Sequence, residues 1–551
     1  MANLLKPIRQ RWFLRGQEGM ILVIALLFLV VLCLMGIAAI MTSTSTTSIF
    51  GGLRRADEAL YNAEAGIEAA RRIIAQENPN FDQVYADGGK LPGLEGSVKF
   101  GNGSYEVKII NDDSDDGGPY KENNGIYIVR STGIVGDAVK TLEVVVQSFS
   151  RFFYFSQVEE APGMTGSDIA QKDVFFRTGD VMDGPVHSNS ALKIAGNPVF
   201  NAMASSSESP IKMEGSASDD QIFLGGTNWS RTVSLPVGPD KQFGTSDDLD
   251  EVYQGVLARG KLYDTFNDPS QNPFKGPDPN NLGHSTEFRV HLQGDQGEKA
   301  SIYKLIVHDP DGIPGNGDEY VVLEWRLVET LEIGAGFNGV VYFHGGGTLH
   351  VGGKIKDGSL DESGTASEVK GKWTIASDLL PSDTTDRGID KAGPVQIDGD
   401  IRYIGDYSNT NYNGTSNIFP IVIDPKDHKE TVKAEGLLGL VSANNVWINY
   451  VDTIRSNGIT IHASIMATCR EQSGSFSADT RYLDPANMTP GKPLNLMGGI
   501  IQYYRGVVGF FDGTALTAGF QKNYKYDSRL YYMSPPSFPV AVNLKMKSWK
   551  E

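Results

Sequence analysis

The stretch that decides the fold runs from Met20 to Met41 and reads "MILVIALLFLVVLCLMGIAAIM". Its 22 residues carry no charge, and they are long enough to span the hydrocarbon core of a bilayer. Four Lys or Arg residues lie within the 19 residues before it, which would hold that side in the cytoplasm. A secretory signal has a shorter apolar core with a small-residue cleavage site behind it, whereas here Gly19 stands in front. We therefore expect residues 1–19 to be a leader that is removed, leaving the apolar helix on the mature protein.

The residues that follow predict that this helix continues. Leu53, Leu60, Ile67 and Ile74 are spaced by seven, and alanines lie three residues after each of the first three. This is an a/d stripe in which large and small side chains alternate. The pattern predicts one helix over 20–76, about 85 Å long, with a transmembrane part at 20–41 and a second half lying on a sheet. An Asn-Pro pair at 78–79 ends it.

Three strand candidates lie between residues 100 and 150. They read "GSYEVKII", "GIYIVRSTG" and "KTLEVVVQSF", and the first alternates apolar and polar residues cleanly. A long helix over a short antiparallel sheet makes a first domain of residues 20–150.

Gly19-Met20, the apolar run and "ADEALYNAEAGIEAARR" at 56–72 together resemble type IV pilins, specifically the PilX family of minor pilins. The resemblance is close over about 9–76 and general to about 150. It implies a prepilin peptidase that cuts after Gly19 and methylates Met20. It also implies a single-pass inner-membrane protein before assembly, an extracellular pilus component afterwards, and other minor and major pilins as partners.

One position departs from the major pilins that this sequence resembles. They carry a glutamate at the fifth mature position, where it neutralises the terminal amine of a neighbouring subunit, and here that residue is Ile24. A subunit without the carboxylate gains nothing from docking beneath a charged terminus in apolar surroundings. The resemblance therefore implies a place at the filament tip, with a PilY-type tip adhesin as partner.

The sequence pattern of the remainder of the chain, 151–551, is different: short apolar segments alternate with Gly, Asn and Asp, as in "GVVYFHGGGTLHVGGKI". Such strands fit the stacked turns of a β-solenoid, and a large sandwich is the alternative. An insertion with hairpin character is expected at about 205–330. The predicted fold class is α+β: a long helix with a pilin-like sheet, followed by a mainly-β, β-helix-like domain.

Two acidic loops in the insertion match each other in spacing. "PDKQFGTSDD" and "PDGIPGNGDE" place carboxylates around a glycine, as calcium requires, although neither fits the EF-hand pattern. A solvated polar turn explains both loops at least as well. The candidate calcium ligands are Asp240, Asp247, Asp248, Asp311, Asp318 and Glu319.

Other features narrow the function class. The net charge of −18 argues against a nucleic-acid-binding surface, yet residues 491–551 carry eight basic and three acidic residues among many aromatics. We expect this segment to cap an open end of the solenoid, with docking of a partner protein and binding of single-stranded nucleic acid as alternatives.

Asp398 and Asp400 in "QIDGDIR" are the carboxylates that glycan cleavage would use, but alternating carboxylates are common in non-enzymes.

The sequence as a whole predicts a non-enzymatic minor pilin that primes assembly and carries its β domain to the tip for adhesion. The assembly residues would be Ile24 and the stripe Leu53, Leu60, Ile67 and Ile74. Two alternatives stay open. One is a K-type pseudopilin of a type II secretion system, whose large domain is mainly helical by resemblance. The other is a membrane-anchored, glycan-active β-helix protein.

Overall fold

The computed structural model describes residues 17–77, 84, 88–111, 126–161, 174–233, 260–264, 282–308, 323–334, 336–344, 348–356, 359–360, 366–377, 395–407, 418–423, 430–467, 474–512, 515–531 and 533–546.

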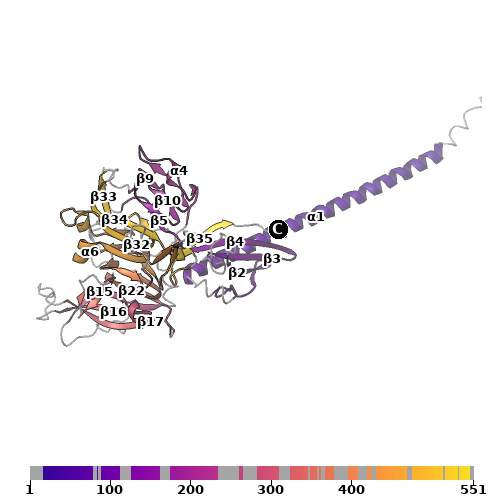
Figure 1. The fold of residues 1–551 in the computed structure, drawn as a ribbon. Coiled ribbons are helices and arrows are strands. Elements are labelled where there is room, and N and C mark those ends of the chain that lie inside the picture. The colour runs from indigo at the N-terminus through magenta and orange to yellow at the C-terminus, as the bar shows by residue number, and fades with distance from the viewer. Residues whose placement is uncertain are drawn as a thin grey trace, which may run out of the picture.

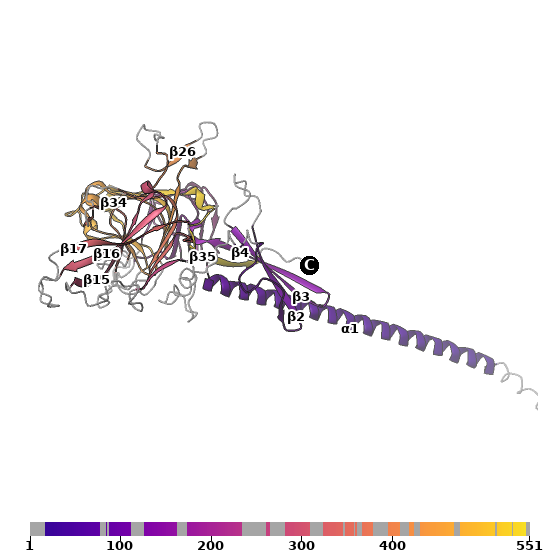
Figure 2. The same cartoon turned by 90° about the horizontal axis from the view of Figure 1, so that it is seen from below.

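The first part of the molecule is one helix lying on an antiparallel sheet (Figure 1). Helix α1 (Gln17–Glu77) is continuous over 61 residues, which is roughly 90 Å. Its second half packs on a sheet with the order β1-β2-β3-β4-β35, while its first half projects away from the body in both views (Figure 2). The strands are β1 (Val98–Phe100), β2 (Gly103–Asn111), β3 (Ile126–Val135), β4 (Ala138–Ser148) and β35 (Val540–Met546). The predicted long helix and its three strands are confirmed.

Small residues let α1 lie close to this sheet. Ala59 and Ala63 are fully buried against it, and Ile67 and Ile74 are 5% and 1% exposed. A Cβ atom on Gly133 of β3 would lie 1.9 Å from the Ala59 carbonyl oxygen and 2.5 Å from the Ala63 nitrogen. Position 133 must therefore be a glycine for the helix backbone to pass where it does.

The last strand, β35, returns to the first sheet. It pairs antiparallel with β4, beginning with Val540 opposite Ser148, and the Ser148 hydroxyl lies 2.8 Å from that of Ser534. The expected boundary at residue 150 put the whole C-terminal part in the large domain. The large domain instead begins and ends at two adjacent strands of the helix-bearing sheet. A pairing across almost 400 residues leaves no local pattern in the sequence.

The large domain starts as a three-sided parallel solenoid. Phe176 pairs with Ile194, Val181 with Val199 and Val186 with Ala204, so this turn takes 18 residues, whereas the step from Ala204 to its partner Thr227 takes 23. Its strands are β5 (Tyr154–Val158), β6 (Phe176–Arg177), β7 (Val181–Met182), β8 (Val186–Ser188), β9 (Lys193–Ala195), β10 (Val199–Phe200), β11 (Ala204–Ser206), β12 (Ile211–Lys212) and β13 (Thr227–Asn228), with the short helix α4 (Asp219–Ile222).

The second half of the solenoid has two parallel sheets and turns of unequal length. One contains β14 (Lys261–Asp264), β18 (Val340–His344), β23 (Gly371–Ser377), β28 (Gly436–Ser442), β30 (Ile459–Ala467) and β32 (Lys492–Tyr504). The other contains β19 (Thr348–Val351), β24 (Val395–Ile397), β29 (Val446–Ile448) and β31 (Phe476–Ala478). Smaller pieces are β20 (Ile355–Lys356), β21 (Ser359–Leu360), β22 (Ser367–Val369), β25 (Ile401–Tyr403), β26 (Ile421–Ile423), β27 (Glu430–Val432), β33 (Gly509–Asp512), β34 (Ala515–Tyr526) and helix α6 (Asp452–Asn457).

The two halves join in the middle of one sheet, whose order is β13-β11-β8-β5-β32-β30-β28-β23-β18-β14. The chain enters at β5, builds outward to β13, resumes at β14 and winds back to β32, which lies parallel to β5 with Ile500 opposite Tyr154. The predicted α+β fold, a long helix followed by a large, mostly β domain, is confirmed. The segment at 491–551 does not cap an open outer end, because β32 and β34 lie at this inner junction.

The predicted insertion begins too early. Residues 204–228 form the parallel strands β11, β12 and β13, which belong to the solenoid. The hairpin character belongs to three long strands, β15 (Leu282–Leu292), β16 (Lys299–His308) and β17 (Leu323–Glu332). They pair antiparallel with one another, and β15 joins the sheet in parallel with β19. Short solenoid strands and short hairpin strands look alike in sequence, because both place one or two apolar residues between turn residues.

Candidate functional site

The exposed half of α1 is the first candidate site. Among the described residues, α1 is the helix that is long and apolar enough to cross a membrane. Its most apolar segment is not buried against any other part of the chain. Gly19 and Met20 lie in its first turns, and the Met20 side chain is 61% exposed. Ile24 is 49% exposed and offers only carbon to a neighbour. An apolar surface of this length requires lipid or other helices around it.

Hydroxyl groups in the middle of α1 are satisfied within the helix. Thr42, Thr44, Thr46 and Thr47 donate to the carbonyl oxygens four residues earlier at 2.8, 2.7, 2.7 and 2.9 Å. A threonine that bonds its own helix does not need water or a polar partner. This polar stretch can therefore lie beside lipid or beside an apolar helix at little cost.

The predicted stripe divides between the exposed part of α1 and the part on the sheet. Leu53 is 57% exposed, Leu60 is half-buried, and Ile67 and Ile74 are buried against the chain's own sheet. The two C-terminal members therefore hold the helix on its sheet. Leu53 remains free for contact with another chain. The assembly role of the stripe stays a prediction.

The six candidate calcium ligands all lie outside the described residues, in 234–259 and 309–322. Among the residues that the structure does describe, no three His, Cys, Asp or Glu side chains gather to hold a metal ion. Calcium binding stays a prediction.

Asp398 is a buried structural group. Arg289 donates to its carboxylate, His350 Nδ1 lies 2.7 Å away, and Asn449 Nδ2 donates at 2.8 Å. Burial opposes the charge, but His350 and Arg289 outweigh it and hold the pKa of the Asp398 carboxyl well below its usual range. Asp400 likewise accepts from the Thr460 backbone at 2.8 Å. A general acid for glycan cleavage needs a raised pKa, so Asp398 does not fit that role.

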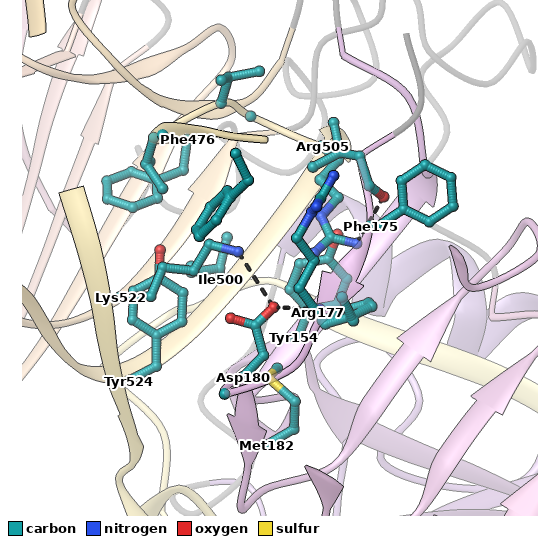
Figure 3. A pocket seen from close by; sticks show the side chains of 18 of the residues that line it. Tyr154, Phe175, Arg177, Asp180, Met182, Phe476, Ile500, Arg505, Lys522 and Tyr524 are labelled. Carbon is teal, nitrogen blue, oxygen red and sulfur yellow. Dashed lines mark hydrogen bonds and ion pairs between the residues drawn. The ribbon is translucent and has the colours of Figure 1, made fainter. Parts of the chain in front are cut away.

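A cavity at the junction of the solenoid halves is the second candidate site (Figure 3). On one face β5 and β32 are paired, but on another face the described strands of the two sheets end at β6 and at β31 without pairing. The gap has a volume of about 530 Å³, within the range of small-molecule sites. Its walls carry Tyr154, Phe175, Phe176, Phe476, Phe510, Phe511 and Tyr524, with the charged Arg177, Asp180, Arg505 and Lys522.

A buried ion pair fixes the floor of this cavity. Arg505 Nη1 lies 2.6 Å from Glu159 Oε2, with side chains 5% and 0% exposed, and its guanidinium stacks 3.8 Å from the Phe176 ring centre. The Tyr154 hydroxyl donates to Glu159 at 2.8 Å, and burial above all raises the pKa of Tyr154, so the phenol keeps its proton. A buried pair with this many partners is rigid, and it presents a preorganised wall.

Lysine and aspartate face each other across the cavity. Lys522 Nζ lies 3.5 Å from Asp180, which also accepts from the Arg177 backbone nitrogen at 2.9 Å (Figure 3). Burial lowers the pKa of Lys522, and Asp180 only partly offsets this. The basic-aromatic run of 491–551 contains Arg505 and Lys522, but nothing in the local sequence marks Glu159 or Asp180 as their partners.

Comparison with known proteins bears on the helix first. The family described as PilX N-terminal matches residues 18–68, which cover Gly19, Met20 and most of α1. The N-terminal module of this chain is type IV pilin-like. A domain of unknown function, DUF4900, matches 127–208, from β3 of this pilin-like module into the first turns of the solenoid.

Whole-chain similarity to known proteins is slight. A crystal structure of the competence-associated pilin ComZ from Thermus thermophilus is 10% identical, with 90% of this chain and 96% of that one covered and a TM-score of 0.28. A score this low carries no argument about the large domain. No curated protein matches the sequence. A pilin-related role therefore rests on the N-terminal module, whose apolar helix fits membrane anchoring.

Proposed function

We propose that the chain is a non-enzymatic minor pilin of a type IV pilus that primes assembly and sits at the filament tip. The observation that carries the proposal is α1 itself. Its second half is locked onto the chain's own sheet, while residues 20–41 expose a continuous apolar surface that resumes at Ile49, Phe50 and Leu53. Such a helix is built to enter the inner membrane first and then a bundle of pilin helices.

Processing follows from the same segment. The prepilin peptidase would cut after Gly19 and methylate Met20, leaving Ile24 as the fifth mature residue. An isoleucine there cannot neutralise the terminal amine of a neighbouring subunit, which favours the one position that has no subunit above it. The partners would be other minor and major pilins, and a PilY-type adhesin at the tip.

The large domain supports an end position and an adhesive role. The ten strands along the central path of its largest sheet span roughly 45 Å, several helix diameters. A body of this size has more room at an end than along a shaft of close-packed helices. Its mainly β composition speaks against a K-type pseudopilin, and the engaged Asp398 speaks against glycan cleavage.

The test combines processing with position. Gly19→Ser should leave the leader on the chain and abolish its incorporation into pili, measured by N-terminal mass spectrometry and immunoblots of sheared filaments. Ile24→Glu should move immunogold label from filament ends onto the shaft, and Val23→Glu, the same charge one residue earlier, should not. Normal piliation with unprocessed protein, or uniform shaft labelling of the unmutated chain, would contradict the proposal.

A further inference from the structure

The cavity at the solenoid junction is a preformed site of fixed shape. It exists because the two solenoid halves wind toward each other and join along one face only, so the edges at β6 and β31 stay apart. Exposed apolar side chains stand at its rim, Val181 at 47% and Phe510 at 41%, and the buried Arg505–Glu159 pair forms its floor. Aromatic walls with a few converging polar groups are typical of ligand sites.

The charges of the cavity favour an anion. Among the described residues, Arg177, Lys522 and Arg505 bring three cationic groups to this wall, where Arg505 pairs with Glu159 and Lys522 faces Asp180. The whole chain carries −18. Lys522 meets Asp180 only at 3.5 Å, and its lowered pKa shows that this partner does not fully offset its burial. A ligand carboxylate between the cations would supply the missing stabilisation.

The backbone edges that face the cavity are already used. The Arg177 nitrogen donates to Asp180 Oδ2 and the Arg177 oxygen accepts from the Asp180 nitrogen. Across the gap, the Ala478 nitrogen donates to the Val507 oxygen and the Phe476 nitrogen donates to Gln502. An extended peptide would need a run of free backbone groups to add as a strand, and these groups of the described edges β6 and β31 are already bonded. A small molecule that bonds through its own hydroxyl groups has no such need.

We propose that this cavity binds an acidic sugar, a pyranose unit that carries a carboxylate. The carboxylate would lie toward Arg177 and Lys522, and ring hydroxyls would donate to the remaining acceptor positions of Asp180. The C–H face of the ring would pack on the aromatic wall, where Phe511 already lies 5.4 Å below the Arg177 guanidinium. The carboxylate of Asp180 distinguishes this ligand from an unsubstituted aromatic acid such as benzoate, which has no hydroxyl group to donate to it.

The sugar-binding proposal is independent of the proposed pilin function, because all residues of the cavity belong to the solenoid. Loss of processing in Gly19→Ser would leave sugar binding intact, and loss of sugar binding would leave assembly intact. Failure of either proposal is therefore visible separately.

The experiment uses the mature full-length protein in detergent micelles with D-galacturonate, D-glucuronate, N-acetylneuraminate, neutral D-galactose and benzoate. Calorimetric titration or saturation-transfer NMR should show saturable binding of at least one acidic sugar, with a Kd on the order of 1 mM, and about tenfold weaker binding of galactose. Arg177→Gln should weaken binding of the acidic sugar about tenfold, and Phe510→Ala at the rim should weaken the same binding. Arg402→Gln, a half-exposed arginine on β25 away from the cavity, should leave it unchanged.

Several outcomes would overturn the assignment. They are no saturable binding of any of the three acidic sugars, equal binding by Arg177→Gln, and tighter binding of benzoate than of the sugars. Phe510 is largely exposed, so its variant keeps the test valid if Arg177→Gln fails to fold.

Discussion

Gly133→Ala should detach the stalk helix from the sheet. The added Cβ atom would lie 1.9 Å from the Ala59 carbonyl oxygen and 2.5 Å from the Ala63 nitrogen, whereas real Cβ contacts keep at least 3.0 Å. The helix must therefore move outward by about 1.1 Å (3.0 − 1.9) at this crossing. Both obstructing atoms are backbone atoms, so no side chain can rotate away.

The cost follows from the packing that such a shift disrupts. Inserting a methyl group into a packed interface costs about 1–3 kcal/mol, and we take about 2–3 because the obstacle is rigid. An isolated helix segment is marginal in water, so amides at 59–74 should open more often once the sheet no longer holds them. At 1.4 kcal/mol per factor of ten, their hydrogen exchange should accelerate about 30- to 150-fold.

The assay is hydrogen exchange by mass spectrometry on the mature full-length chain in micelles. Gly96→Ala is the matched control, since nothing lies within 4 Å of its added Cβ atom and its φ is not positive. Exchange at 59–74 that changes by less than about threefold in Gly133→Ala would refute the close-approach argument.

Two further predictions concern the stability of the solenoid. Asp398→Ala leaves the charge of Arg289 buried without its carboxylate partner and should destabilise the large domain by about 3–5 kcal/mol. Asp452→Ala, which removes one partner of an exposed ion pair, should cost only about 0–1 kcal/mol. Urea unfolding of both variants measures the difference, and equal midpoints would contradict the prediction. Burial lowers the pKa of His187 to about 4 and that of His462 to about 3, from the ordinary histidine value of 6.5. Below pH 6.5 these histidines therefore take up protons in the unfolded chain before they do so in the folded one. The stability that the two neutral side chains contribute is complete above pH 6.5 and is lost as the pH falls toward 4 and 3. Thermal unfolding between pH 7 and pH 4 should show a falling Tm whose slope is reduced in His462→Gln, and an unchanged slope would refute this.

Local pattern was enough to predict the elements of the pilin-like module. An uncharged run of 22 residues can only be stable as a helix in lipid, and the alternation in "GSYEVKII" fits one face of a sheet. Both reflect periodicities that neighbouring residues impose on each other. The β-solenoid was recognisable from its texture of short apolar strands and turn residues, although its 18-residue period at 176–212 was not.

The candidate cavity could not be predicted in the same way. Its four charged residues come from positions 177–180, 505 and 522, and their meeting depends on which strand β32 pairs with. The basic-aromatic composition of 491–551 indicated that the segment had a special role. It did not indicate the inner junction, because composition carries no information about long-range register.

The sequence by itself determined that this protein has a membrane-competent helix and a turn-rich β domain, and it predicts processing after Gly19. These follow from hydrophobic length and local periodicity, which act over one to three turns of chain. Only the tertiary structure decided that β35 returns to β4 and that two solenoid halves meet at β5 and β32. Strand pairing is driven by backbone hydrogen bonds that are the same for every residue, so the choice of partner is settled only when the whole chain packs.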